Sequence, residues 1–433
     1  MSGYLIKPAR KAFLKGEITI PSSKSQTLRA LLFAALAEGR SWIHQSLLSD
    51  DALRMIDACR LLGAEINEDM GNDTIEVTGV NGSITHSKDV IYAGNSGIVL
   101  RFLSALAGLG SHPFVITGDH SIRYQRPMQA LLGGLSQLGV SAKSMRGDGY
   151  APVIIQGPFS SGRVSISGED SQPVSALLIA AAFAEIPITI DVENLGEKPW
   201  VDLTLHWLKK LGISYINQND SCFQFFGKSR YPGFSYHVPG DFSSAAFPIA
   251  AALITRSALT LKNIDMNDPQ GDKKVIDLFK SMGAGIHLDE ENKMLRIEKG
   301  AQLSGREIDV NDHIDAITIL AVVACFAEGE TRIVNGAVAR KKECDRIHCI
   351  ASELRKMGAD IDETADGLII RPASLHGAEV ESHGDHRMAM SLAAAALGAR
   401  GNSLIRSVKC VSKTYPAFVR DFNHIGAAIQ EVE

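Results

Sequence analysis

The chain has 433 residues, of which 45% are hydrophobic and 6% aromatic, and its formal net charge is −5 with histidine neutral. A chain of this length supports two or three hydrophobic cores. Its near balance of charge excludes a protein whose main role is binding nucleic acid or an anionic membrane surface. The six cysteines form no C-x-x-C pair, which is typical of reduced thiols in a reducing compartment.

Neither a signal peptide nor a membrane span is expected. The N-terminal stretch MSGYLIKPARKAF has no continuous apolar segment of the kind that signal peptides carry. The longest apolar runs, ALLIAAAFA and ILAVVACFA, are far shorter than the ~18 residues of a membrane-spanning helix. We therefore expect a cytoplasmic globular protein.

Taken in chain order, the predicted helices repeat as two interleaved series. Alanine-rich helices, each opening with small or polar residues, are predicted at 22–39, 94–110, 168–185, 240–254, 311–329 and 384–401. They are apolar on nearly all sides, which is typical of buried helices. Amphipathic helices lie between them and end at glycines spaced 68 to 76 residues apart, namely Gly63, Gly139, Gly212, Gly283, Gly358 and Gly426. A left-handed residue is expected at such helix ends.

Short β-branched stretches such as EITIP, VIYAG, RVSIS and REIDV precede the buried helices and predict strands. The predicted unit is strand, buried helix, strand, amphipathic helix and strand, repeated six times in an α/β fold. Chains of this size usually divide into domains, and the Pro-Gly of YHVPGDFSS is the natural boundary. We therefore expect one domain at 22–240 and a second formed by 1–21 and 241–433.

The openings of the buried helices indicate an anion-binding function. If the six helices stand side by side, their free N–H groups and partial positive charges form an anion-binding surface. The openings also contain charged or polar residues that folding does not require, namely Lys24, Arg29, Asn95, Arg101, Asp315, His386 and Arg387. An ordinary N-cap is the alternative for any single opening, but six openings in phase favour a shared site.

Seven motifs, in this order, resemble the signatures of the 5-enolpyruvylshikimate-3-phosphate synthase family: PSSKSQTLRA, GNSGIVLR, SQPVSALL, KPWVDLTL, KKECDRI, DHRMAM and SKTYPAF. The resemblance covers essentially the whole chain. It implies two inverse α/β domains, each of three βαβαββ units, with the active site in the cleft between them. It also implies transfer of the enolpyruvyl group of phosphoenolpyruvate to the 5-hydroxyl of shikimate 3-phosphate, with release of phosphate, in the shikimate pathway of aromatic amino acid biosynthesis. No cofactor is implied.

The resemblance assigns site residues by motif position. Both substrates carry a carboxylate and a phosphate, so several arginines and lysines have to converge. The residues implied to bind shikimate 3-phosphate are Lys24, Ser25, Arg29, Ser171, Gln172, Asp315 and Lys342. Those implied to bind phosphoenolpyruvate are Lys24, Asn95, Gly97, Arg126, Gln172, Arg346, Arg387 and Lys413.

The resemblance also implies catalytic roles. Asp315 would take the hydroxyl proton as general base, Glu343 would deliver and later remove the carbon-bound proton, and Lys24 would assist proton transfer. No metal site is expected, because no set of His, Cys and carboxylate residues has convincing ligand spacing. His383 and His386 flank Asp385, but we expect His386 to pack or hydrogen-bond near the site.

Several positions depart from the family pattern. Ile98 replaces a common threonine, and its β-branched apolar side chain predicts weaker binding of bulky phosphoenolpyruvate mimics such as glyphosate. Asp170 and Glu197 stand where serines are usual, and an acidic side chain repels phosphate, so Asp170 is expected to point away from it. Trp200 replaces a tyrosine and Val338 an asparagine, which leaves their roles open.

Two other functions are alternatives to enolpyruvyl transfer onto shikimate 3-phosphate. UDP-N-acetylglucosamine enolpyruvyl transferases usually carry a reactive cysteine on a mobile loop and a Lys-Asn pair in the first motif, whereas 111–126 has no cysteine and the pair is Lys24-Ser25. A non-catalytic anion-binding descendant would not need Asp315 and Glu343 beside anionic ligands. We expect a monomer, since no large exposed apolar stripe is evident, with the two small substrates as its only partners.

Overall fold

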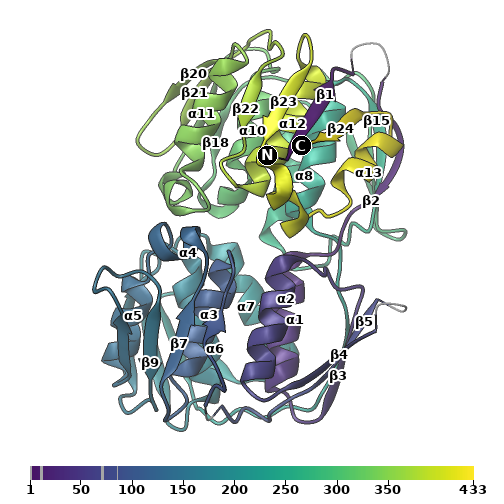
Figure 1. The fold of residues 1–433 in the computed structure, drawn as a ribbon. Coiled ribbons are helices and arrows are strands. Elements are labelled where there is room, and N and C mark those ends of the chain that lie inside the picture. The colour runs from purple at the N-terminus through teal and green to yellow at the C-terminus, as the bar shows by residue number, and fades with distance from the viewer. Residues whose placement is uncertain (1, 10–12, 70–72, 85) are drawn as a thin grey trace. The chain divides into compact units, whose positions relative to one another are not determined.

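The computed structural model describes residues 2–9, 13–69, 73–84 and 86–433. The chain divides into two compact units (Figure 1). The first unit comprises Met1–Pro21 and Pro239–Glu433, and the second comprises Ser22–Val238. The N-terminal segment belongs to the first unit because its strands pair there, as the sheet order below shows.

The second unit contains three four-stranded sheets. Their strand orders are β14 (Ser235–His237), β3 (Arg40–His44), β5 (Thr74–Thr78), β4 (Glu65–Asp69); β6 (Ile91–Tyr92), β7 (Phe114–Thr117), β9 (Val153–Gln156), β8 (Ser141–Ser144); and β10 (Arg163–Ser167), β11 (Ile188–Glu193), β13 (Cys222–Phe225), β12 (Tyr215–Gln218). In each sheet the first pair is parallel and the other two are antiparallel.

The first unit repeats this arrangement. Its strand orders are β2 (Lys15–Thr19), β15 (Ala258–Lys262), β17 (Met294–Ile297), β16 (Ile286–Asp289); β18 (Glu307–Asp309), β19 (Thr331–Val334), β21 (Leu368–Arg371), β20 (Asp360–Glu363); and β22 (Glu379–Glu381), β23 (Ser403–Arg406), β1 (Gly3–Lys7), β24 (Ala428–Val432). Again one parallel pair is followed by two antiparallel pairs. The β2 and β1 strands complete the first and last of these sheets.

All six predicted buried helices are present, namely α1 (Lys24–Leu36), α3 (Gly97–Ala107), α6 (Ser171–Phe183), α8 (Phe242–Ile254), α10 (Ile317–Ala324) and α12 (His386–Gly398). Nearly every residue in them is buried. Alanine explains both properties, because it has the highest helix propensity and lets neighbouring backbones approach closely. Five of the six helices begin after a serine or aspartate whose side chain accepts a hydrogen bond from the first turn.

The amphipathic helices cover the sheets and the buried helices. They are α2 (Asp50–Leu61), α5 (Gln129–Gln137), α7 (Lys198–Lys210), α9 (Lys274–Ser281), α11 (Arg346–Lys356) and α13 (Phe418–His424), with α4 (His120–Tyr124) as a short extra turn. The six glycines predicted at their C-terminal ends all have positive φ, between 73° and 108°. Short 3-10 helices, η1 (Gly271–Lys273), η2 (Asn311–Ala316), η3 (Ala337–Lys341) and η4 (Val408–Lys413), connect other elements.

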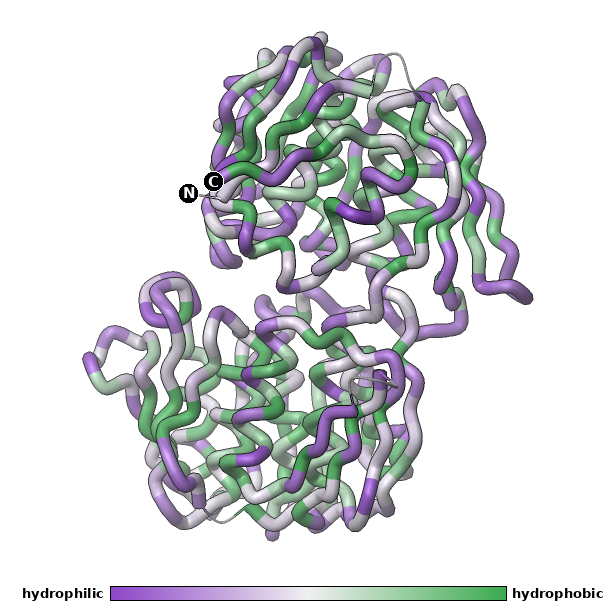
Figure 2. The backbone as a smooth tube through the Cα atoms, turned by 45° about the vertical axis from the view of Figure 1, so that its right-hand side comes forward, coloured by the Kyte–Doolittle hydropathy of each residue, from purple (hydrophilic) through white to green (hydrophobic). Residues whose placement is uncertain are grey.

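Each unit has its own hydrophobic core. In Figure 2 the hydrophobic stretches run through the interior of each unit. In the second unit the core includes Trp207, which stacks on Phe33 at 5.5 Å between ring centroids and donates its indole N–H to Gln26 Oε1 at 2.6 Å. Among the residues described, no helix is both long and apolar enough to cross a membrane.

A close backbone approach in the second unit gives the first testable prediction. Gly79 follows β5, and a Cβ atom placed on it would overlap the carbonyl oxygens of Ala34 and Ala37 at the end of α1. Backbone atoms cannot rotate away, so we expect Gly79→Ala to lower the free energy of unfolding by about 2 kcal/mol. The thermal unfolding midpoint, followed by circular dichroism, measures the change.

Gly133 in α5 provides the matched control, because a Cβ atom there meets nothing within 4 Å. We expect Gly133→Ala to raise stability by up to about 1 kcal/mol through helix propensity. A Gly79→Ala protein that unfolds at the wild-type temperature would contradict the close approach.

Candidate active site

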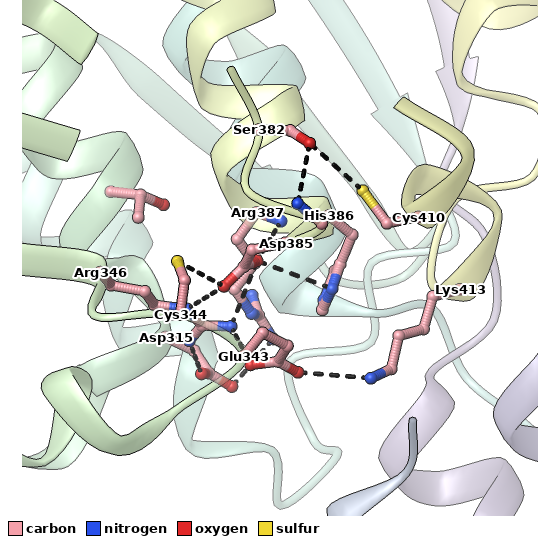
Figure 3. A network of polar contacts seen from close by, with 12 residues as sticks. Asp315, Glu343, Cys344, Arg346, Ser382, Asp385, His386, Arg387, Cys410 and Lys413 are labelled. Carbon is pink, nitrogen blue, oxygen red and sulfur yellow. Dashed lines mark hydrogen bonds and ion pairs between the residues drawn. The ribbon is translucent and has the colours of Figure 1, made fainter. Parts of the chain in front are cut away.

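In the first unit, one buried arginine holds three carboxylates (Figure 3). Arg346 is the first residue of α11, and its side chain is 1% exposed. It donates to Asp315 Oδ1 at 2.6 Å, to Glu343 Oε2 at 2.8 Å and, through Nε, to Asp385 Oδ2 at 2.7 Å. The three carboxylates come from η2, from the segment before α11 and from the N-cap of α12. Arg346 therefore ties three elements together.

A second arginine shares Asp315. Arg387, in the first turn of α12, donates from Nη2 to Asp315 Oδ2 at 2.8 Å. Its backbone N–H donates to Asp385 Oδ1 at 2.8 Å, so Asp385 both caps α12 and binds Arg346. Asp315 is thus clamped between two guanidinium groups, one on each carboxylate oxygen.

Two lysines complete the positive charge. Lys413, at the end of η4, lies 3.3 Å from Glu343 Oε1, and both side chains are almost fully buried. Lys342 is buried and acts on Asp315 electrostatically. Four cations therefore surround three carboxylates here, which leaves the cluster with a positive excess.

The charges determine the protonation state of the cluster. Burial alone would raise the pKa of Asp315, but Arg387, Arg346 and Lys342 outweigh burial and hold that pKa well below its usual range. Burial opposes the charge of Arg346 in the same way, yet Asp385, Glu343 and Asp315 raise its pKa above the usual value. Asp315 is therefore ionised at neutral pH.

The openings of three buried helices meet beside this cluster. A small cavity is lined by Ser243 and Ala246 of α8, by Asp315 of η2 and Ile319 of α10, and by Arg387 of α12. These residues lie at or just before the N-terminal ends of the three helices, so three helix openings meet within the first unit. Their dipoles favour an anion at this place. That all six openings share one site stays a prediction.

In the second unit, residues at the openings of α3 and α6 are in contact. Arg101 donates to Gln172 Oε1 at 2.7 Å and pairs with Asp170 Oδ2 at 3.2 Å. A Cβ atom on Gly97 would lie 2.9 Å from both Arg101 Nη1 and Gln172 Oε1, and 3.7 Å from Arg126 Nη1. Gly97 therefore lets three polar side chains approach one backbone position. Asn95, just before α3, donates to Asp119 Oδ2 at 2.8 Å.

The first two turns of α1 carry two further cations, Lys24 and Arg29. Lys24 lies 3.7 Å from Asp51 Oδ2 of α2. Arg29 is buried and donates to Thr204 Oγ1 at 2.9 and 3.1 Å, to the Trp200 carbonyl and to the Ser25 carbonyl, both at 3.3 Å. Burial lowers the pKa of Arg29 to about 9, which leaves it charged at neutral pH. In the described parts of the chain, Arg29 forms no ion pair with a carboxylate.

The structure shows the contacts of four residues that depart from the family pattern, namely Asp170, Glu197, Ile98 and Val338. Asp170 accepts from Gln172 N at 3.0 Å and pairs with Arg101. Ser171 donates both its backbone N–H and its hydroxyl to Glu197. Ile98 packs against the core of the second unit, and Val338 packs against that of the first.

Two residues of these clusters received no substrate or catalytic role from their motif position. Asp385 binds Arg346, and Arg101 binds Gln172 and Asp170. Asp385 stands directly before His386-Arg387, where its role as an N-cap gives the only sequence signal. Its second role, as the Nε acceptor of an arginine 39 positions earlier, needs the folded chain.

Two histidines, His383 and His386, lie near this cluster. His383 Nε2 lies 3.0 Å from Glu353 Oε1, and His386 is buried with Nδ1 3.8 Å from Asp385. Among the residues that the structure describes, no group of three or more His, Cys, Asp or Glu side chains is arranged to hold a metal ion.

Comparison with known proteins decides the family. The family model for EPSP synthase (3-phosphoshikimate 1-carboxyvinyltransferase) matches residues 8–422. The 3-phosphoshikimate 1-carboxyvinyltransferase of Acetivibrio thermocellus is 45% identical over 99% of this chain and all of that protein. The chain belongs to the EPSP synthase family. The enzyme of the same name from Chlamydia muridarum is 45% identical over 96% of this chain and 93% of its own length.

Solved structures similar to this chain are also EPSP synthases. An EPSP synthase from Acinetobacter baumannii, determined at 2.37 Å, superposes with a TM-score of 0.81 at 29% identity and covers all of both chains. The family and the α/β fold predicted from the motifs are therefore confirmed. The EPSP synthase matches do not favour the UDP-N-acetylglucosamine alternative.

The shared arginine gives the second prediction. We expect Arg346→Met to leave three carboxylates without their common cation and to destabilise the protein by about 3–5 kcal/mol. The pKa of Asp315 lies below its unfolded value, so its pairing adds stability that is present above about pH 4 and lost as the pH falls. The deficit of the variant should therefore shrink in acid, which denaturant titrations at several pH values measure.

Arg371 is the matched control. It also contacts three carboxylates, Asp360 at 3.0 Å, Asp362 at 2.9 Å and Glu330 at 3.3 Å, but its side chain is 40% exposed. Arg371→Met should change stability only slightly, because water solvates the carboxylates that it leaves. Equal losses in the two variants would contradict a special role for the buried cluster.

Proposed function

We propose that the protein transfers the enolpyruvyl group of phosphoenolpyruvate to the 5-hydroxyl of shikimate 3-phosphate and releases phosphate. Membership of the EPSP synthase family over residues 8–422 supports this reaction. The single structural observation that supports it most is the clamp of Arg346 and Arg387 on Asp315, because it combines a base with two anion-binding groups.

The cations are proposed to bind the anionic groups of the substrates. Arg346, Arg387 and Lys413 of the first unit, with Lys24, Asn95, Gly97, Arg126 and Gln172 of the second, are the proposed phosphoenolpyruvate ligands. Lys24, Ser25, Arg29, Ser171 and Gln172 of the second unit, with Asp315 and Lys342 of the first, are the proposed shikimate 3-phosphate ligands. Both proposed sets include residues of both units.

The reaction is an addition followed by an elimination. In the addition, Glu343 protonates the methylene carbon of phosphoenolpyruvate, the 5-hydroxyl oxygen bonds to the neighbouring carbon, and Asp315 takes the hydroxyl proton. In the elimination, the carbon–oxygen bond to phosphate breaks, and Glu343 removes a proton from the new methyl group to restore the double bond. Lys24 is proposed to assist this proton transfer.

The clamp on Asp315 explains how the base could be activated. A carboxylate held by two arginines is a weak base, because its charge is already neutralised. Anionic substrates that attract Arg346 and Arg387 would weaken both ion pairs and raise the basicity of Asp315. Substrate binding and activation of the base are thereby coupled in the proposed mechanism.

Release of inorganic phosphate tests the reaction. We expect release that requires both phosphoenolpyruvate and shikimate 3-phosphate, and none when UDP-N-acetylglucosamine replaces the latter. A protein that binds shikimate 3-phosphate without turnover would be the non-catalytic alternative. A cytoplasmic monomer is our proposal for its state in the cell.

A third prediction concerns the proposed base. Asp315→Asn keeps the shape of the side chain but cannot accept the proton, so we expect kcat to fall about 10²–10⁴-fold. Asp312→Asn, in the same 3-10 helix but exposed, should keep wild-type kcat. The phosphate-release assay measures both variants, and a fully active Asp315→Asn protein would rule out this residue as the base.

A fourth prediction concerns inhibition by glyphosate. Gly97 already has Arg101 and Gln172 close to its backbone, and Ile98 follows it with a stiff side chain packed on the core. We expect Ile98→Thr to relieve crowding near Gly97 and to lower the glyphosate concentration needed for half inhibition. Leu109→Thr, a change on a partly buried side chain packed against the same core, is the control. Unchanged inhibition in Ile98→Thr would show that Ile98 does not limit the mimic.

A further inference from the structure

Glu197 places a carboxylate at the opening of α6. Its side chain lies in the interior, with the residue 1% exposed, and Oε2 accepts from the Ser171 backbone N–H at 3.1 Å and from the Ser171 hydroxyl at 3.0 Å. The backbone of Glu197 is left-handed, with φ 47° and ψ 36°, at the N-cap position of α7. A residue other than glycine rarely adopts this conformation, and it persists only where the surrounding structure enforces it.

The next backbone N–H group of α6, that of Gln172, also donates to a carboxylate. Asp170 accepts from the Gln172 backbone N–H at 3.0 Å and pairs with Arg101 at 3.2 Å. The first two backbone N–H groups of α6 therefore both donate to acidic side chains of the protein itself. Helix N-termini attract anions of any origin, so an incoming anion competes with these two carboxylates.

The two carboxylates occupy different donors at this opening. Asp170 accepts from the Gln172 backbone N–H. Glu197 accepts from both donors of Ser171, the backbone N–H and the hydroxyl. An anion that approaches Ser171 therefore finds both of its donors already bound to the carboxylate of Glu197.

We infer that Glu197 is a specificity-determining residue whose carboxylate competes with the substrate phosphate for the two donors of Ser171. The inference rests on the proposed function, because it takes Ser171 as a ligand of shikimate 3-phosphate. Two anions cannot share the same pair of donors without strong repulsion, so Glu197 leaves Ser171 when the phosphate binds. The cost of that displacement lowers the affinity for shikimate 3-phosphate.

Removal of the charge should therefore tighten binding. Glu197→Gln keeps the length of the side chain and an oxygen that accepts from Ser171, but it no longer repels phosphate. We expect about tenfold tighter binding of shikimate 3-phosphate, measured by titration calorimetry on the full-length protein. Glu193→Gln is the matched control: Glu193 ends β11, is exposed and accepts from Ser165 at 3.2 Å, and its removal should leave the affinity unchanged.

Binding of shikimate, which lacks the phosphate, shows whether Glu197 competes with the phosphate or has only a structural role. If Glu197 competes with the phosphate, Glu197→Gln binds shikimate with wild-type affinity while its affinity for shikimate 3-phosphate rises. Equal changes for both ligands would overturn the inference, because they would place Glu197 against the ring or assign it a role in folding. Unchanged or weaker binding of shikimate 3-phosphate would also overturn it.

A second variant covers the case in which Glu197→Gln does not fold. Glu197→Asp keeps the charge but is one methylene shorter, so its contact with Ser171 weakens. We expect it too to bind shikimate 3-phosphate more tightly than the wild type, and binding that is no tighter would contradict the inference. A wild-type protein that fails to bind shikimate 3-phosphate would instead refute the proposed function, so the two failures are distinguishable.

Discussion

The ion pairs of Arg346 are the interaction on which the first unit depends. One guanidinium group, 1% exposed, binds carboxylates from η2, from the segment before α11 and from the opening of α12. Burying a charge is unfavourable unless it is fully paired. Displacement of any one of these elements would leave a buried charge unpaired, so their positions depend on one another. The same contacts bring Asp315, Glu343 and Arg387 into one cluster, and the geometry of the proposed chemistry follows from a requirement of folding.

The second unit follows a related rule. Asp51 lies against Lys24, Asp170 against Arg101, and Glu197 against Ser171. In both units, groups suited to bind external anions are matched in the free protein by carboxylates of the chain itself. An anionic ligand therefore replaces a carboxylate of the protein on these groups. Its affinity depends on the free energy needed to displace that carboxylate.

Much of this architecture could be predicted from the sequence, because its signals are local. Small or polar openings followed by alanine-rich apolar runs predicted all six buried helices. Gly63 and Gly426, the first and last of the terminating glycines, have the left-handed φ expected of helix ends. The partners within the clusters could not be predicted. The contact of Asp385 with Arg346 spans 39 positions, and that of Glu197 with Ser171 depends on a left-handed backbone at a non-glycine residue. The pairing of β14 with β3, almost 200 residues apart, likewise depends on the whole fold.

The central claim is that anionic substrates take the place of Asp315 on its two arginines. A crystal structure of the wild-type protein equilibrated with phosphoenolpyruvate and shikimate 3-phosphate tests it most directly, since both substrates and the enolpyruvyl product carry carboxylate and phosphate groups. We expect ligand oxygens within hydrogen-bond distance of Arg346 and Arg387, with Asp315 released from at least one of them and facing the substrate hydroxyl. Both ion pairs intact, with the ligands bound elsewhere, would contradict the account.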